Sequence, residues 1–398
     1  MAPAGDEPPL QLSDFQAETI RGTPGFVRVG RTRAGSWWLI GPDDRAFFAC
    51  GVHLDAGMMR TLPTAHAAVW GVNTMVIDGG VPPAGWAGAW IAAIRFRPDA
   101  PGALIRLQGV QLPDVFDPDW ARACHERAAE VCPPGVGDPR LIGWMPDAGL
   151  QWTQAPGVLP RPALLQICLS LEPRFAAYHA AWEFVLAAHG GELSAVAAAW
   201  ETALPNKESL RLLTHEDHAL ETAGYRHDEE RFTKEFARLY FSAVTAAIRA
   251  QDPAHLILGV IPPDGPAAVA EAAGPSVDML ATGPGAVVAT AQLEGWSRGA
   301  AAPVFLTGYS WSGGDLAASP GRTPLEHMLE RGRAALATII AHPAAVGYAW
   351  REWCDLPEDR PPFGRGLVRV DGGTAREHTD LLTEINLGAE ARRRASRP

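Results

Sequence analysis

The sequence lacks several features that would assign it to a class at once. Its 398 residues contain no apolar run of the roughly 18 residues that a membrane-spanning helix needs. The first residues, MAPAGDEPPLQLSDF, include neither a basic nor an apolar stretch, so we expect a cytoplasmic protein without a secretory signal. Basic residues number 34 against 45 acidic ones, a formal net charge of −11. Without any basic block, this balance argues against nucleic acid or an anionic membrane as a partner.

Cysteine is scarce, and no metal-binding spacing is present. The five cysteines are widely scattered and form no CxxC pair, which favours reduced thiols over a disulfide framework or a zinc site. The segment His215-Glu216-Asp217-His218 could present two ligands to one ion, but its spacing indicates no third ligand. We therefore expect a solvated loop there, and neither a metal nor a cofactor.

What is present is a globular composition, with 47% hydrophobic and 20% charged residues. The length suits two average domains or one large α/β barrel. The runs FVRVG, SWWLI and AFFACGV predict an N-terminal β-hairpin that leads into the first core strand. Residues 1–25 and 389–398 are predicted to be flexible ends, which leaves 26–388 as a single domain. Further short apolar runs predict strands at roughly 46–53, 71–78, 102–109, 141–147, 255–261, 277–282, 303–310 and 345–351.

Helical patterns separate several of these strands. Asp228 to Gln251 carries apolar residues at intervals of four, and Thr323 before Pro324 predicts the start of another helix. The interval between the fourth and fifth strands is too long for one crossover, so we expect a helical insertion at about 150–228. Eight strands alternating with helices predict a (β/α)8 TIM barrel. A doubly wound sheet is the alternative, but no GxGxxG follows the first strand.

Several segments together resemble one enzyme family. GSWWLIGPDDRAFFACGV at 35–52, DPRLIGWMPDAGLQW at 138–152, PVFLTGYSW at 303–311 and HPAAVGYAWREWCDLP at 342–357 are similar, in the same order, to segments of β-agarase-like glycoside hydrolases. The resemblance covers most of the chain. It implies a (β/α)8 barrel whose members are retaining hydrolases, with an acid/base glutamate ending the fourth strand and a nucleophilic glutamate ending the seventh. Such chemistry needs two carboxyl groups about 5–5.5 Å apart.

Both glutamates of that family pattern are missing. Where the family has D-N-E-L, this chain has DAGL at 147–150, and where it has T-E-[FY]-S, this chain has TGYS at 307–310. The glutamates thus align with Gly149 and Gly308. Glycine can neither donate a proton nor form a glycosyl ester. The resemblance therefore implies a hydrolase-like barrel that has lost retaining-glycosidase chemistry.

Other side chains at the predicted strand ends could still act on a substrate, since functional groups of such barrels lie at the C-terminal ends of the strands. Asp147 matches the family's aspartate, and Trp350 resembles the eighth-strand tryptophan on which a sugar stacks in the family. His53 could act as a general base, since the unperturbed pKa of a histidine lies near neutrality. The catalytic candidates are Asp147, His53, Asp55, Asp78 and Glu352. The substrate-binding candidates are Trp152, Tyr309, Trp311, Trp350, Arg351 and Gln108, the last on the predicted third strand.

Three functions remain open. The first is recruitment to acid/base chemistry (cyclisation, elimination, isomerisation or hydrolysis) on a small polyhydroxylated or polycyclic metabolite. The Ala-, Arg- and Pro-rich composition resembles that of high-GC actinobacterial proteins, where such recruitment would belong to specialised metabolism. The second is a non-catalytic, carbohydrate-binding pseudoenzyme. The third is a glycosidase that uses displaced carboxylates. The expected partner is a small molecule or saccharide, and the oligomeric state stays open.

Overall fold

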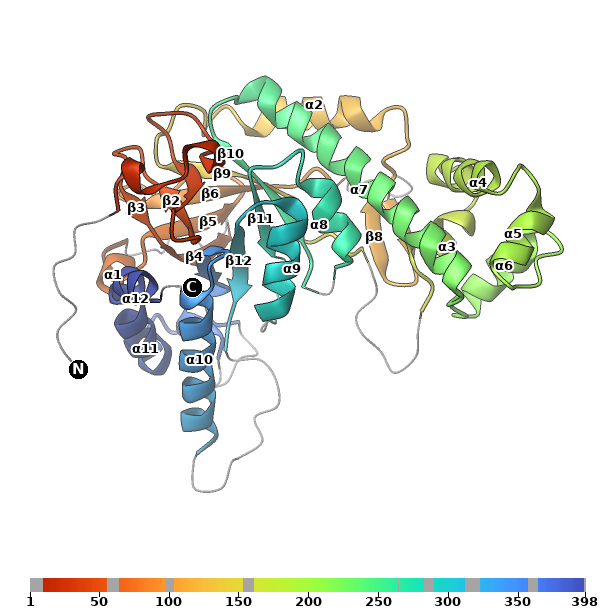
Figure 1. The fold of residues 1–398 in the computed structure, drawn as a ribbon. Helices are drawn as coiled ribbons and strands as arrows, with labels where there is room; N and C mark the ends of the chain where they lie inside the picture. The colour runs from red at the N-terminus through yellow and green to blue at the C-terminus, as the bar shows by residue number, and fades with distance from the viewer. Residues whose placement is uncertain are drawn as a thin grey trace.

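Eight parallel strands close into a barrel in the computed structural model, which describes residues 10–55, 64–97, 104–152, 161–263, 265–282, 290–311, 323–356 and 364–396 (Figure 1). Each strand pairs with its neighbours in parallel, and the eighth pairs with the first. The predicted (β/α)8 barrel is therefore confirmed. The barrel strands are β4 (Ala49–Asp55), β5 (Thr74–Asp78), β6 (Ala89–Ile94), β9 (Leu141–Pro146), β10 (Leu256–Ile261), β11 (Met279–Thr282), β12 (Val304–Tyr309) and β13 (Ala345–Trp350).

Helices cover the outside of this barrel. Thr323 begins α10 as predicted, because its hydroxyl accepts the Glu326 N–H while the Glu326 carboxylate accepts the Thr323 N–H. No described helix is long and apolar enough to cross a bilayer. The outer helices are α1 (Thr64–Val69), α2 (Trp120–Val131), α7 (Ala223–Gln251), α8 (Ala267–Ala273), α9 (Thr290–Ala300), α10 (Pro324–Ala341) and α11 (Arg376–Leu387).

The predicted third strand is wrong. The third barrel strand is β6, whose sequence AWIAAI is rich in alanine, a residue with weak strand preference. The apolar run expected at 102–109 instead forms β7 (Leu104–Leu107), which pairs antiparallel with β8 (Val110–Pro113). This hairpin, called here the β7–β8 hairpin, stands outside the barrel wall, so residues on it do not end a barrel strand.

An antiparallel sheet closes the N-terminal end of the barrel. The predicted hairpin gains a third strand, giving β1 (Arg28–Arg31), β2 (Trp37–Ile40) and β3 (Ala46–Phe47). Val29 and Leu39 of this sheet pack with the residues that fill the barrel interior, among them Leu256 and Phe305. Burial of this aliphatic and aromatic cluster removes its apolar surface from water and closes the N-terminal end of the barrel.

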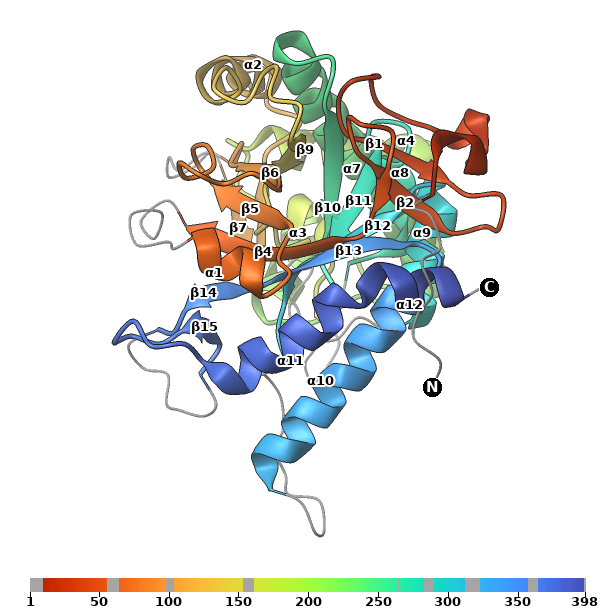
Figure 2. The ribbon, with the colours of Figure 1, turned by 90° about the vertical axis from the view of Figure 1, so that its left-hand side faces the viewer.

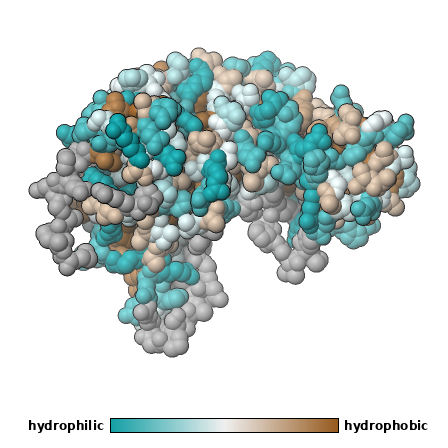
Figure 3. Space-filling model, viewed as in Figure 1, coloured by the Kyte–Doolittle hydropathy of each residue, from teal (hydrophilic) through white to brown (hydrophobic). Residues whose placement is uncertain are grey.

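The helical insertion after the fourth strand is also confirmed. It contains α3 (Leu164–Leu169), α4 (Ala176–Ala188), α5 (Leu193–Ala199) and α6 (Lys207–His215), and it continues into α7. Helices α3–α6, called here the helical lobe, extend to one side of the barrel, and the outline of the molecule is indented between this lobe and α10 (Figures 1 and 3). Asp228 on α7 accepts hydrogen bonds from His189 and Trp200, which joins the lobe to the long helix.

Both ends of the described chain contain helical segments and make contacts with the rest of the fold. Residues 389–395 form α12 (Ala389–Ala395), which lies with α10 and α11 along one side of the barrel (Figure 2). Its Arg393 is buried and donates to the carbonyl oxygens of Trp37, Ile340 and His342. At the other end, Phe15 is buried against the N-terminal sheet. Residues on both sides of the predicted limits 26 and 388 therefore pack against the barrel and its N-terminal sheet.

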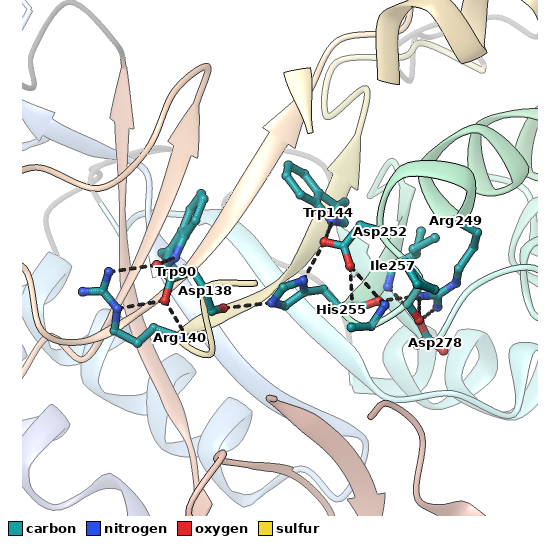
Figure 4. A network of polar contacts seen from close by, with 11 residues as sticks. Trp90, Asp138, Arg140, Trp144, Arg249, Asp252, His255, Ile257 and Asp278 are labelled. Atoms are coloured by element: carbon teal, nitrogen blue, oxygen red, sulfur yellow. Dashed lines mark hydrogen bonds and ion pairs between the residues drawn. The ribbon is translucent and has the colours of Figure 1, made fainter. Parts of the chain in front are cut away.

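A network of ion pairs and hydrogen bonds crosses the N-terminal ends of β9, β10 and β11 (Figure 4). His255 Nδ1 lies 2.6 Å from the Asp252 carboxylate, and its Nε2 lies 2.8 Å from the Asp138 carbonyl oxygen. Since both ring nitrogens face acceptors, the arrangement suits a doubly protonated imidazolium. Asp138 also pairs with Arg140 at 2.8 Å. We call the group Asp138, Arg140, Asp252 and His255 the lower network.

Candidate functional site

Titratable side chains at the barrel mouth gather on the side formed by β13, β4 and β5. His53 lies on β4 between these two neighbours, since Val52 pairs with Trp350 and His53 pairs with Val76. Asp55 ends β4 and pairs with Asp78, which ends β5. The backbone thus brings together residues that the sequence separates by almost 300 positions. We refer to this side of the mouth as the His53 side.

His53 is held by the end of β12. Its Nε2 contacts the Thr307 hydroxyl and lies 3.1 Å from the backbone nitrogen of Gly308, which donates to it. A ring nitrogen that accepts an N–H carries no proton, so the neutral ring holds its proton on Nδ1. Burial, together with the nearby Arg351 charge, lowers the pKa of His53 to about 4. The ring is therefore neutral at physiological pH.

A β-bulge shapes the backbone that contacts His53. Between the pairs Leu306–Tyr348 and Tyr309–Trp350, β12 has one residue more than β13. Gly308 lies in this bulge with φ +69°, a left-handed conformation that side chains with a Cβ disfavour. Gly149, after β9, has open space around it and an ordinary φ. The two glycines that align with the family's glutamates thus differ. The left-handed backbone at Gly308 favours glycine, whereas the backbone at Gly149 can accept a side chain.

Three predicted acidic residues lie at or just after strand ends on the His53 side: Asp55 ends β4, Asp78 ends β5, and Glu352 follows β13. Asp78 is exposed and lies 3.8 Å from Arg95. Glu352, the first residue of β14 (Glu352–Cys354), lies 3.5 Å from Arg351 and 3.6 Å from Arg365. Arg351 directly follows the end of β13 and lies near enough to His53 for its charge to act on that ring. The side chain of Asp55 falls outside the described part of the structure.

Asp147 lies at the end of the fourth strand but is enclosed. One carboxylate oxygen accepts the N–H groups of Phe96 and Arg97, each at 2.9 Å, and the other accepts the Tyr240 hydroxyl at 2.8 Å. The residue is 4% exposed, with φ +44°, a conformation that aspartate tolerates better than most residues. Burial raises the pKa of Asp147, and these hydrogen bonds act in the opposite direction. The geometry is that of a carboxylate that fixes the backbone after β6.

The four predicted aromatic ligands belong to the core. Trp152 is 1% exposed and packs against Phe236, Tyr240 and Phe241, so its predicted place at the mouth is wrong. Tyr309, Trp311 and Trp350 form a buried cluster outside the barrel wall. Trp311 lies against α10 where Gly332 leaves room for its ring. The expected stacking platform of Trp311 and Trp350 is therefore closed to solvent in this structure.

The predicted position of Gln108 at the end of a barrel strand is also wrong. It lies in the turn of the β7–β8 hairpin, and its side-chain nitrogen donates to the Thr214 carbonyl oxygen at the end of α6. The cause is the wrong third strand described above. Conversely, sequence reasoning missed Thr307 as a partner of His53. The available signal was a polar residue two positions after Phe305, on the interior-facing side of the seventh strand.

A metal site is not indicated by the described segments, where no three His, Cys, Asp or Glu side chains lie close enough to share an ion. His218 in the segment considered above lies 3.9 Å from Glu216, and Asp217 lies 3.8 Å from Arg161. These are ion-pair distances on the surface of the lobe.

Several solved structures have a fold similar to that of this chain. No family model and no curated protein matches the sequence. Among solved structures, PfGH50B has a TM-score of 0.73 at 15% identity, covering 98% of this chain and 68% of its own. An exo-β-agarase has 0.69 at 16%, covering 96% and 68%, and the agarase AgWH50C has 0.67 at 16%, covering 94% and 66%. This chain shares its fold with these three proteins. The chain spans about two thirds of the length of these three proteins.

A β-galactosidase of the psychrophilic Marinomonas ef1 shares the fold more distantly, with a TM-score of 0.56 at 11% identity. This chain covers 59% of that protein. Because identities are low throughout, the similarity concerns the fold, and the chemistry has to be inferred from the residues at the mouth.

Proposed function

We propose that this agarase-like barrel does not hydrolyse glycosides by double displacement and instead performs acid/base chemistry on a small polyhydroxylated or polycyclic metabolite. One observation carries the proposal: at the end of β12 a glycine with φ +69° gives its N–H to His53. A nucleophilic glutamate at this position would need a strained backbone, and the place beside it is taken by the imidazole.

His53 has a defined role in this proposal. It is neutral, and its Nε2 already accepts the Gly308 N–H, so the proton on Nδ1 is the one that it can offer to a substrate oxygen. A neutral imidazole can polarise a carbonyl or hydroxyl in this way. Asp55 and Asp78 end β4 and β5, Glu352 follows β13, and their carboxylates would accept protons. Arg351, beside Glu352, would hold an anionic group of substrate or intermediate.

Asp147 has a supporting role in this proposal rather than a chemical one. Removing its carboxylate would leave the buried N–H of Phe96 and the partly buried N–H of Arg97 without their acceptor. We assign it to positioning the loop after β6.

The test is a screen of metabolites and oligosaccharides by calorimetry, followed by mass spectrometry of each bound compound. Turnover of one compound by the wild-type chain, lowered by at least about 100-fold in His53→Gln, would support the proposal. The matched control is His125→Gln, which changes an exposed histidine of α2 and should turn over at the wild-type rate.

A second candidate function is a saccharide-binding barrel without catalysis. The observation in its favour is that both Asp147 oxygens and the His53 Nε2 are already hydrogen-bonded within the protein. It predicts tight binding of a saccharide that is recovered unchanged after long incubation. Burst release from an aryl glycoside, with covalent labelling of Asp55, Asp78 or Glu352 by a fluorinated sugar, would overturn both candidates in favour of displaced catalytic carboxylates.

A further inference from the structure

A pocket of about 290 Å³ lies between the β7–β8 hairpin and the helical lobe. None of its lining residues belongs to a barrel strand, so it is distinct from the His53 side of the mouth. Its charged and aromatic lining residues are Arg106, Glu172, Arg174, Phe175, Arg211 and His215.

The walls of this pocket are fixed to one another by buried hydrogen bonds. Thr214, at the end of α6, is fully buried and accepts through its carbonyl the side-chain N–H of Gln108 from the hairpin turn. Its hydroxyl oxygen accepts hydrogen bonds from the Ser170 hydroxyl at 2.8 Å and from the Gln166 side-chain nitrogen at 3.2 Å. These bonds join α3 and the residue after it to α6. The hairpin and the lobe therefore hold the pocket in one shape before any ligand arrives, which lowers the entropic cost of binding.

The charge of the pocket is opposite to that of the protein. Three arginines face it against one glutamate, in a chain whose net charge is −11. Arg174 lies 2.9 Å from Glu172, and Arg211 lies 3.3 Å from Glu208. Arg106 makes no hydrogen bond or ion pair with any residue in the described segments. An arginine without a partner in a preformed concavity is suited to bind an oxyanion through two parallel N–H bonds.

We propose that this pocket binds a small organic oxyanion, a carboxylate or a sulfate or phosphate ester, with Arg106 as its principal cation. Phe175 and the leucines that line the pocket, Leu104, Leu107 and Leu171, would cover the apolar part of the ligand. This site goes beyond the function proposed for the mouth and does not depend on it.

The experiment is calorimetric titration of the whole chain at constant ionic strength with benzoate, acetate, sulfate and phosphate. We expect saturable binding that weakens at least about tenfold in Arg106→Ala, the effect of losing one charge-assisted hydrogen bond. Arg106→Lys should be intermediate, because lysine lacks the planar fork. The variant should fold normally, since the native side chain is exposed.

The matched control is Arg226→Ala, which removes an exposed arginine of α7 that pairs with Glu221 outside the pocket and should leave binding unchanged. Equal dissociation constants for the wild type and Arg106→Ala, or heats that follow ionic strength alone, would overturn the proposal. The relative affinity of carboxylates, sulfate and phosphate identifies the anionic group. Benzoate binding no tighter than acetate would overturn the role assigned to Phe175 and the leucines.

Discussion

The two ends of the barrel use their polar groups in opposite ways. At the N-terminal end, the acidic, basic and imidazole groups of the lower network are paired with one another, and Asp252 and His255 are buried. At the C-terminal end, Gly149 follows the fourth strand and Gly308 lies in the seventh, and apart from the enclosed Asp147 the candidate titratable residues lie on one side around His53. In such barrels the N-terminal end serves stability and the C-terminal end serves chemistry. The comparison teaches that the polar groups which stabilise this barrel are separate from those at which we propose chemistry.

The contrast between the two barrel ends would be wrong if the lower network contributed little to the free energy of unfolding. His255→Ala removes the only cationic partner shown for the buried Asp252 within the described residues. We expect a loss of about 3–5 kcal/mol in the free energy of unfolding, as for other buried pairs that lose one member. Urea denaturation measures it. His125→Ala, at an exposed position, should change the value by less than about 0.5 kcal/mol; an equally small effect of His255→Ala would contradict the assignment.

Acid should weaken the lower network in a defined pH range. Burial raises the pKa of Asp252, but hydrogen bonding and the charge of His255 outweigh it and lower the pKa to about 2. A depressed pKa stabilises the fold fully above the unfolded value near 3.8, and this contribution is lost as pH falls through about 2. We expect about 2 kcal/mol of stability to disappear between pH 4 and pH 2 in urea titrations, from the size of the shift.

In Asp252→Asn this part of the pH dependence should be absent, because the side chain no longer titrates. Asp380→Asn, at an exposed position on α11, should follow the wild-type profile. The interpretation fails if Asp252→Asn still loses the same stability over this range of pH.

Two glycine variants test the difference between Gly308 and Gly149 at the mouth of the barrel. Gly308→Ala places a Cβ at φ +69° and should cost about 1–2 kcal/mol, whereas Gly149→Ala has ordinary backbone and open space and should stay within about 0.5 kcal/mol of the wild type. Thermal and urea unfolding of the two variants measure the difference. Equal stabilities would show that the β12 bulge relaxes, and would remove the main support for a mouth that excludes a nucleophile at this position.

Much of the fold follows from local patterns in the sequence. Capping at Thr323, the apolar stripe of α7 and seven of the eight barrel strands are readable because they depend on neighbours within a few residues. The third strand is not readable, since AWIAAI has the composition of a helix and becomes a strand only between β5 and β9. Tertiary pairing there outweighs local propensity.

Less of the candidate site follows from the sequence. His53, Asp55, Asp78, Arg351 and Glu352 are predicted by their place at strand ends, because strand order alone brings those ends together. The sequence cannot tell whether a side chain at such a position faces the interior or the surrounding helices. A β-bulge in β12 places Tyr309 and Trp311 in the buried aromatic cluster, and three protein donors enclose Asp147.

By itself, the sequence determined an eight-stranded barrel with a helical insertion and a mouth in which two expected glutamates are glycines. These properties follow from the periodicity of apolar residues, the lengths of the segments between strands and the residue types at strand ends. All three can be read from residues that are close together in the chain. Only the tertiary structure decided that Gly308 gives its N–H to His53, that Asp147 is enclosed, and that Arg106 faces a pocket built by Gln108 and Thr214. Each of these contacts joins residues far apart in the chain, and packing alone brings them within hydrogen-bond distance.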